Sequence, residues 1–137
     1  MADPSPPVLH MSPMRRLLGI ELLELREGFA RIRYRPNPQH ANYSGILHGG
    51  ILMTLLDEAA GIAGSWAPDP QPPRKSVTVE MSVHFTDMVF PDTDWIDATG
   101  EIVRGGRSLF FVRSEVRDPT GELLAYGAST HRWRSGG

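Results

Sequence analysis

The chain has 137 residues, enough for one domain with a sizeable core and too few for two domains of ordinary size. Its formal net charge of -2 gives no support for nucleic acid as a partner, and the absence of cysteine excludes disulfides and thiolate metal ligands. No apolar run reaches the roughly 18 residues that a membrane-spanning helix needs. We therefore expect a cytoplasmic protein.

The first 16 residues form a proline-containing segment without the apolar core of a secretion signal. We expect residues 1-16 to be a flexible arm and residues 17-134 to be a single folded domain. The domain opens on a mostly apolar stretch, Leu17–Glu24, which predicts a strand. After a turn with glycine, apolar residues and arginines alternate over residues 30–35, the period of a half-buried strand. The two strands together predict a hairpin.

A long helix is predicted over residues 48–65, after a loop that contains two prolines. Its residues are apolar almost all round, so the helix should be buried. A few polar and small residues nevertheless share one side at helical spacing, namely Thr54, Asp57, Glu58, Gly61 and Ser65.

Beyond a proline-rich connection, residues 77–85 alternate in the manner of a strand, with Val77, Val79, Met81, Val83 and Phe85 on one face and Thr78, Glu80, Ser82 and His84 on the other. Three more strands are predicted over residues 95–103, 108–116 and 123–133, joined by hairpin turns. This order predicts an α+β fold in which a curved antiparallel sheet wraps around one long central helix. One layer of sheet covers only part of such a helix, so we expect the protein to self-associate.

The predicted helix carries features that packing alone does not explain. It opens on Gly49 and Gly50, although glycine costs a helix about 1 kcal/mol per residue against alanine. It also carries two adjacent carboxylates, Asp57 and Glu58, in its middle. The free N–H groups of the first turn can hold an anion, and a carboxylate about two turns further on can act as nucleophile or general base.

The motif His48-Gly49-Gly50 stands at the start of this helix, with Asn42 six positions before it and Asp57 nine positions after it. Thr78-Val79-Glu80-Met81 follows on the long strand, and the turns Gly106-Arg107 and Asp118-Pro119-Thr120-Gly121 come later. This set resembles the hotdog-fold acyl-CoA thioesterases, in particular the phenylacetate-type branch, which is similar to 4-hydroxybenzoyl-CoA thioesterase. The resemblance covers roughly residues 17–133, nearly the whole chain.

The resemblance implies a hotdog fold and an acyl-CoA thioesterase that releases a free acid and coenzyme A. In the family, the residue that matches Asp57 is the nucleophile or activates water, and the backbone N–H that matches Gly49 polarises the thioester carbonyl. The residues that match Asn42 and His48 help to orient the thioester or water, and the hydroxyl that matches Thr78 assists. No metal and no cofactor are implied, because coenzyme A is part of the substrate.

The resemblance also assigns the phosphates of coenzyme A to Arg107 and Arg104, which flank a Gly-Gly turn. We expect a homodimer or a homotetramer built as a dimer of dimers, each site being lined from two subunits with Asp57 from one chain and Thr78 from the other. Glu58 stands beside the expected acid, and a related branch uses glutamate there. The motif alignment nevertheless places Asp57 at the catalytic position, so we expect Glu58 to form a salt bridge or contact solvent.

Two other functions fit part of this pattern. A hotdog module that binds acyl-CoA without turnover would carry the same binding features, and only an activity assay separates it from the enzyme. A hotdog acyl-CoA hydratase is the second alternative, although the spaced Asp and His pair that we associate with that branch is absent from the sequence. Direct attack by Asp57 and general-base activation of water both stay open, as does the identity of the acyl group.

Overall fold

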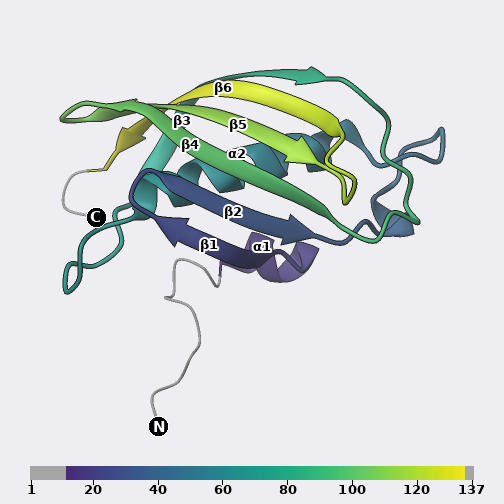
Figure 1. Cartoon of the computed structure of the whole chain (residues 1–137), viewed down its shortest axis with the longest axis horizontal. Coiled ribbons are helices and arrows are strands. Elements are labelled where there is room, and N and C mark those ends of the chain that lie inside the picture. Colours follow the sequence, from purple (N-terminus) through teal and green to yellow (C-terminus); the bar gives the residue numbers. More distant parts are fainter. Residues whose placement is uncertain (1–11, 135–137) are drawn as a thin grey trace, which may run out of the picture.

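The computed structural model of the chain describes residues 12–134. One antiparallel sheet of six strands curves over a long helix, α2 (Gly49–Ser65), as Figure 1 shows. The strand order in the sheet is β1-β2-β4-β5-β6-β3. The strands are β1 (Glu21–Arg26), β2 (Phe29–Tyr34), β3 (Ser76–Phe85), β4 (Ile96–Gly105), β5 (Leu109–Arg117) and β6 (Leu123–Trp133). The α+β hotdog architecture predicted from the sequence is confirmed.

The core lies between the concave face of the sheet and the apolar side of α2. Leu52, Leu55, Leu56 and Ala59 of the helix are at most 3% exposed and pack with Ile32 and other buried residues of the sheet. Gly100 on β4 allows this close approach, because a Cβ there would lie 2.6 Å from the carbonyl oxygen of Ala59. The helix is therefore fixed in its rotation, and its remaining side is left free of the sheet.

The N-terminal part of the domain differs from the prediction. A short helix, α1 (Pro13–Leu18), takes residues that the sequence assigned to the flexible arm and to the start of a strand, so β1 begins at Glu21 and not at Leu17. The Ser12 side chain accepts a hydrogen bond from the Arg15 N–H at the start of α1, and Gly19 ends the helix with a φ of 69°. Capping signals thus outweigh the apolar pattern here. Residues 1–11 of the expected arm lie outside the described residues.

Strand β3 lies at one edge of the sheet, and its alternation is interrupted. The register against β6 shifts between Thr78 and Glu80, the mark of a β-bulge. Val77 and Val79 are 48% and 58% exposed, so the prediction that they share the core face with Met81 is wrong. The extra residue turns Thr78 to the helix side instead, where its hydroxyl reaches α2.

The connections before α2 are ordered by a short 3-10 turn, η2 (Pro38–His40). The buried Tyr34 hydroxyl hydrogen-bonds His40 Nδ1 at 2.5 Å, and burial raises the pKa of the Tyr34 phenol, so it stays protonated. The His40 carbonyl accepts the N–H of His48, the residue that caps α2. Within residues 12–134, every helix is too short or too polar to cross a bilayer.

Candidate active site

A cavity of about 310 Å³ lies beside the middle of α2 and contains the predicted acid; we call it the Asp57 cavity. Residues from α1, α2, the start of β3 and the end of β6 line it. They are Ser12, Arg15, Asp57, Glu58, Gly61, Ile62, Arg74, Lys75, Ser76, Thr78, His131 and Arg134. Carboxylates, hydroxyls and cations predominate, so the Asp57 cavity is suited to polar and anionic groups.

Asp57 is held by a chain of hydrogen bonds that runs into the sheet. The Thr78 hydroxyl donates to Asp57 Oδ1 at 2.5 Å. His131, the cross-strand partner of Thr78 on β6, places Nδ1 3.4 Å from the same hydroxyl. His131 Nε2 in turn lies 2.8 Å from the Ser129 hydroxyl. This arrangement occupies one oxygen of the carboxylate and leaves Oδ2 without a hydrogen-bond partner among residues 12–134.

His131 is deeply enclosed, with 1% of its surface exposed, and its ring stacks on Phe110 at a centroid distance of 4.9 Å. Burial lowers the pKa of its imidazole below the usual value, and the negative charge of Asp57 offsets part of that shift. The ring is therefore neutral at pH 7, with one nitrogen that donates and one that accepts.

Glu58 forms the salt bridge that the sequence predicts. Arg15 Nε lies 2.9 Å from Glu58 Oε2, and the Arg15 side chain is 3% exposed. The pair joins α1 to α2 and forms one wall of the Asp57 cavity. The carboxylate of Glu58 is thus engaged in structure, whereas Asp57 Oδ2 stays available.

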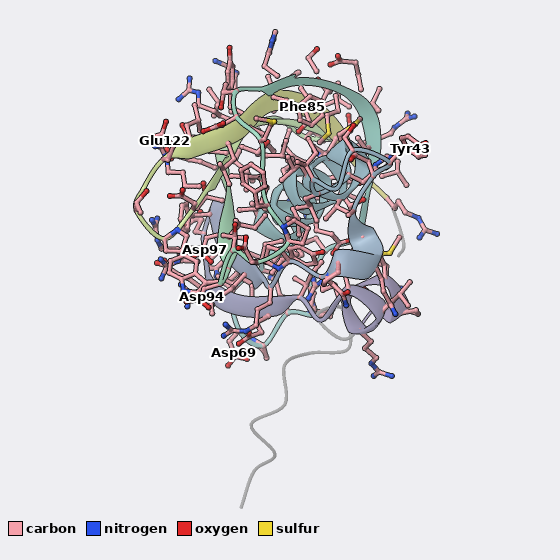
Figure 2. The ribbon with its side chains drawn as sticks, turned by 90° about the vertical axis from the view of Figure 1, so that its right-hand side faces the viewer. Tyr43, Asp69, Phe85, Asp94, Asp97 and Glu122 are labelled. Atoms are coloured by element: carbon pink, nitrogen blue, oxygen red, sulfur yellow. The ribbon has the colours of Figure 1, made fainter. Side chains whose placement is uncertain are left out.

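A second cavity lies at the N-terminus of α2; we call it the Gly49 cavity. Apolar residues predominate in its lining, which consists of Asn42, Ile46, Leu47, Gly49, Leu52, Phe85, Thr86, Asp87, Met88 and Val89. Figure 2 looks onto this end of the molecule, where Phe85 ends β3 and Tyr43 lies at the outer edge, in the loop before α2. Its composition suits an apolar group.

The two glycines of the motif serve different purposes. A Cβ on Gly50 would lie 2.9 Å from His48 Nδ1, so Gly50 is required for the cap. A Cβ on Gly49 would meet only the Phe85 ring at 3.5 Å, an ordinary contact. Among residues 12–134 the Gly49 N–H has no hydrogen-bond partner. The packing explanation therefore accounts for Gly50, and Gly49 offers a free backbone donor at the edge of a cavity.

His48 and Asn42 each use one polar atom for local structure and keep another without a partner in the described part of the chain. His48 Nδ1 accepts the Gly50 N–H at 2.8 Å, so a neutral ring carries its proton on Nε2. Asn42 Oδ1 accepts the N–H groups of Ser44 and Ile46. The Nε2–H of His48 and the amide NH₂ of Asn42 are therefore available as donors; Asn42 lines the Gly49 cavity, whereas His48 lines neither cavity.

The structure brings the predicted site residues together in two groups. Asp57 and Thr78 meet in one chain, so the prediction that they come from different chains is wrong, because the bulge in β3 turns Thr78 toward its own α2. Asn42 and Gly49 line the other cavity. Arg104 and Arg107 lie at the β4–β5 turn and line neither cavity.

Sequence reasoning missed His131, Arg15 and the cations Arg74, Lys75 and Arg134. Their contribution depends on strand register and on the packing of α1 against α2, neither of which has a local sequence signal. The pairing of Thr78 with His131 becomes visible only once β3 is aligned with β6.

A family model described as the thioesterase superfamily matches residues 44–125. Human acyl-coenzyme A thioesterase 13 is 28% identical over 117 residues, which cover 84% of this chain and 81% of that protein. The structure of the conserved protein PA5202 from Pseudomonas aeruginosa superimposes with a TM-score of 0.83 at 28% identity, covering 93% and 98% of the two chains. The E. coli PaaI protein from the phenylacetic acid degradation operon gives a TM-score of 0.80 at 20% identity, covering 94% and 89%, and so shows the shared fold.

Proposed function

Because the chain belongs to the thioesterase superfamily and is a thioester hydrolase, we propose that its substrate is an acyl-CoA, cleaved to a free acid and coenzyme A. The observation that carries this proposal is the Asp57 carboxylate in a polar cavity, with Thr78 fixing one of its oxygens. Thioester hydrolysis needs an activated oxygen nucleophile and a site for the developing oxyanion. The proposed chemistry needs neither a metal nor a further cofactor. A cytoplasmic location stays a prediction of the sequence.

Asp57 supplies the oxygen nucleophile in either of two ways. As a general base, it takes a proton from water while the water oxygen adds to the carbonyl carbon. The tetrahedral species then collapses, the C–S bond breaks, and the proton passes to the departing thiolate of coenzyme A. In direct attack, Oδ2 of Asp57 displaces the thiolate and forms an anhydride, which water hydrolyses. In both routes Thr78 keeps the carboxylate oriented through Oδ1.

The oxyanion is assigned to the start of α2. The Gly49 N–H is unpartnered among the described residues and lies at the positive end of the helix dipole. We assign to His48 Nε2–H and the Asn42 amide the role of orienting the thioester or the water beside it. These donors stabilise a charge that grows as the tetrahedral species forms, so they lower the barrier more than they strengthen substrate binding.

One chain cannot present both groups to the same carbonyl carbon. Gly49 and Asp57 are eight residues apart on α2, which corresponds to about 12 Å along the helix axis. Both must come within about 3 Å of the reacting atoms. The site is therefore composite, with Gly49 from one chain and Asp57 with Thr78 from a second copy.

The exposed side of the molecule fits such a pairing. Met53, midway between Gly49 and Asp57 on α2, is 43% exposed. Thr78 contacts Asp57 at one end of β3, and the Phe85 ring lies beside Gly49 at the other, so β3 runs opposite to α2. A two-fold axis through the middle of both elements would join two β3 edges and place each Gly49 beside the partner's Asp57, because a two-fold interface is self-complementary. The homodimer is thus part of the proposal.

A free-thiol release assay tests the function. Acyl-CoA esters with short, medium, long and aromatic acyl groups are compared at equal concentration. We expect thiol release from at least one class and its loss in Asp57→Asn. Binding of acyl-CoA without release from any of them would favour the non-catalytic module instead.

A further inference from the structure

The two cavities differ in charge, and the cations of the Asp57 cavity are not used by the chemistry described above. Arg74, Lys75 and Arg134 are all exposed and all line it. The chain as a whole has a formal net charge of -2, whereas the lining of this cavity holds four cations, Arg15 included, and the two carboxylates of Asp57 and Glu58. Within residues 12–134, none of the three has an acidic partner within salt-bridge distance.

Hydrogen bonds fix the backbone from which these three cations project. The Arg74 N–H donates to the Ser65 carbonyl at the end of α2, and the Arg134 N–H donates to the Lys75 carbonyl, each at 2.9 Å. The Arg74 guanidinium lies over the Trp133 ring, 3.6 Å from its centroid, which limits its freedom. The Arg74 charge is thus held before any ligand arrives, and Lys75 and Arg134 project from backbone that is hydrogen-bonded together.

We propose that Arg74, Lys75 and Arg134 bind the phosphates of the coenzyme A part of the substrate. The inference rests on the proposed function. Coenzyme A carries a diphosphate and a further phosphate, and arginine and lysine are the side chains that bind such groups. The acyl group then extends into the apolar Gly49 cavity of the partner copy, whose lining contains no lysine or arginine. The thioester lies where the two cavities meet.

This assignment replaces Arg104 and Arg107 as the phosphate ligands. Those two arginines flank the β4–β5 turn and line neither the Asp57 cavity nor the Gly49 cavity. The two assignments therefore make opposite predictions for substitutions at the two places.

The test compares acyl-CoA with the N-acetylcysteamine thioester of the same acid, which lacks the phosphates. In the Arg74→Gln/Lys75→Gln variant, and separately in Arg134→Gln, we expect KM for acyl-CoA to rise about ten- to hundredfold, the effect of losing a hydrogen bond to a charged group. Kinetics with the truncated thioester should not change. Arg132→Gln is the matched control, because Arg132 is exposed on β6 but lines neither cavity.

The outcomes separate the two proposals. If the parent protein hydrolyses neither thioester, the proposed function fails. If it hydrolyses both, and the cavity variants keep the parent KM for acyl-CoA, the phosphate site is overturned while the function stands. A rise in KM in Arg107→Gln alone would return the phosphates to the β4–β5 turn.

A second inference is carried by the hydrogen-bond chain behind Asp57. The Thr78 hydroxyl has one proton, which it donates to Asp57 Oδ1. Its oxygen is then an acceptor for the Nδ1–H of His131, and His131 Nε2 accepts the Ser129 hydroxyl proton. Each donor in the chain, from Ser129 through His131 to Thr78, thus donates in the direction of the carboxylate. A neutral imidazole uses both of its ring nitrogens in this chain, one as donor and one as acceptor.

From this geometry we infer that His131 is a positioning residue that holds the Thr78 hydroxyl in the orientation that donates to Asp57. It does not touch substrate, because it is 1% exposed behind Thr78. This inference too rests on the proposed function. Without His131 the hydroxyl could rotate toward the sheet, and the carboxylate would lose the fixed orientation that leaves Oδ2 for attack.

His131→Phe removes both hydrogen bonds and keeps an aromatic ring against Phe110, whereas His131→Asn keeps an N–H near the position of Nδ1. Provided that the parent protein hydrolyses a thioester, we expect His131→Phe to lower kcat about tenfold with KM unchanged, because the charge-assisted hydrogen bond from Thr78 to Asp57 is lost when the hydroxyl rotates away. The acidic limb of its pH–rate profile should move to higher pH, and His131→Asn should restore most of kcat. A folded His131→Phe with the parent kcat and profile would overturn the inference.

Discussion

The exposed side of α2 offers different chemistry around Asp57, in the middle of the helix, and around Gly49, at its start. Around Asp57 the cavity is lined by carboxylates, hydroxyls and cations, and one carboxylate oxygen is held by Thr78. Around Gly49 the cavity is mostly apolar, and an unpartnered backbone N–H faces it among the described residues. A thioester of coenzyme A has the same two halves, so in the proposed function the start and the middle of one helix each prepare half of a site that a second copy completes.

The largest effect should follow from removing the carboxylate of Asp57, the proposed nucleophile or base in the polar cavity. Asp57→Asn keeps the size of the side chain and the contact with Thr78, but it removes the charge that attacks or activates water. We expect kcat to fall at least about a hundredfold, the scale for a lost base. Thiol release measured at saturating acyl-CoA checks this.

Glu58→Gln is the matched control for Asp57→Asn. Glu58 pairs with the buried Arg15, so this change should lower the melting temperature more than the turnover. If Glu58→Gln abolished turnover and Asp57→Asn kept it, the assignment of the acid would be reversed.

A comparable effect is expected from Gly49→Pro, at the start of α2 beside the Gly49 cavity. Proline removes the backbone N–H, is tolerated at the first residue of a helix, and suits the extended backbone of His48, with φ -62° and ψ 134°. Losing one oxyanion donor costs about 3–4 kcal/mol of barrier, so kcat should fall by about a hundred- to a thousandfold with acyl-CoA binding retained.

Circular dichroism and a thermal melt must first show that Gly49→Pro is folded. Gly49→Ala keeps the N–H and adds a Cβ at an ordinary contact distance from Phe85, so it separates the loss of the donor from the presence of a side chain. If folded Gly49→Pro hydrolyses thioesters near the parent rate, the backbone of Gly49 is not the oxyanion donor.

A smaller loss should follow from Thr78→Val. The variant keeps the shape of the side chain but removes the hydroxyl that donates to Asp57 Oδ1. A hydrogen bond to a charged group contributes about 1.5–3 kcal/mol, so we expect kcat to fall about tenfold or more. Thr78→Ser should restore it, and equal rates in Thr78→Val and the parent would show that the hydroxyl does not orient the acid.

The smallest effect is a pH dependence of stability that comes from His131, beside the Asp57 cavity. Burial lowers the pKa of His131 below its unfolded value of about 6.5, so below that pH the unfolded chain binds more protons than the folded one. The stabilisation should be fully present above about pH 6.5 and decline, as pH falls, by at most about 1.4 kcal/mol per pH unit. Urea unfolding of the parent and of His131→Phe between pH 5 and pH 8 measures it. Parallel curves would show that His131 does not contribute.

The helix and its motif could be predicted from the sequence because their signals are local. The run of apolar residues, the His48 cap and the two glycines mark the start of α2, and its length places Asp57 two turns further on. The strands and turns after it follow from alternation and turn residues. At the N-terminus the same reasoning failed. The Ser12 cap and Gly19 delimit a helix over residues that the pattern predicted to be part of the arm and of a strand.

The remaining parts of the site could not be predicted because they depend on register. Strict alternation puts Thr78 on the same face as Glu80, whereas one extra residue in β3 turns it to Asp57. His131 becomes relevant only as the cross-strand partner of Thr78. Among the cations of the Asp57 cavity, Arg74 and Lys75 directly precede β3 and Arg134 directly follows β6; these two strand ends are adjacent in the sheet and about 60 residues apart in sequence.

Subunit complementation tests the composite site most directly. Asp57→Asn and Gly49→Pro are each expected to be nearly inactive, and the two chains are refolded together in equal amounts. In a mixed dimer, one site receives Asp57 from one chain and Gly49 from the other, so the mixture should recover about a quarter of the parent activity. If both groups acted within one chain, no site in any dimer would be intact. A mixture no more active than the sum of its two components would therefore contradict the composite site.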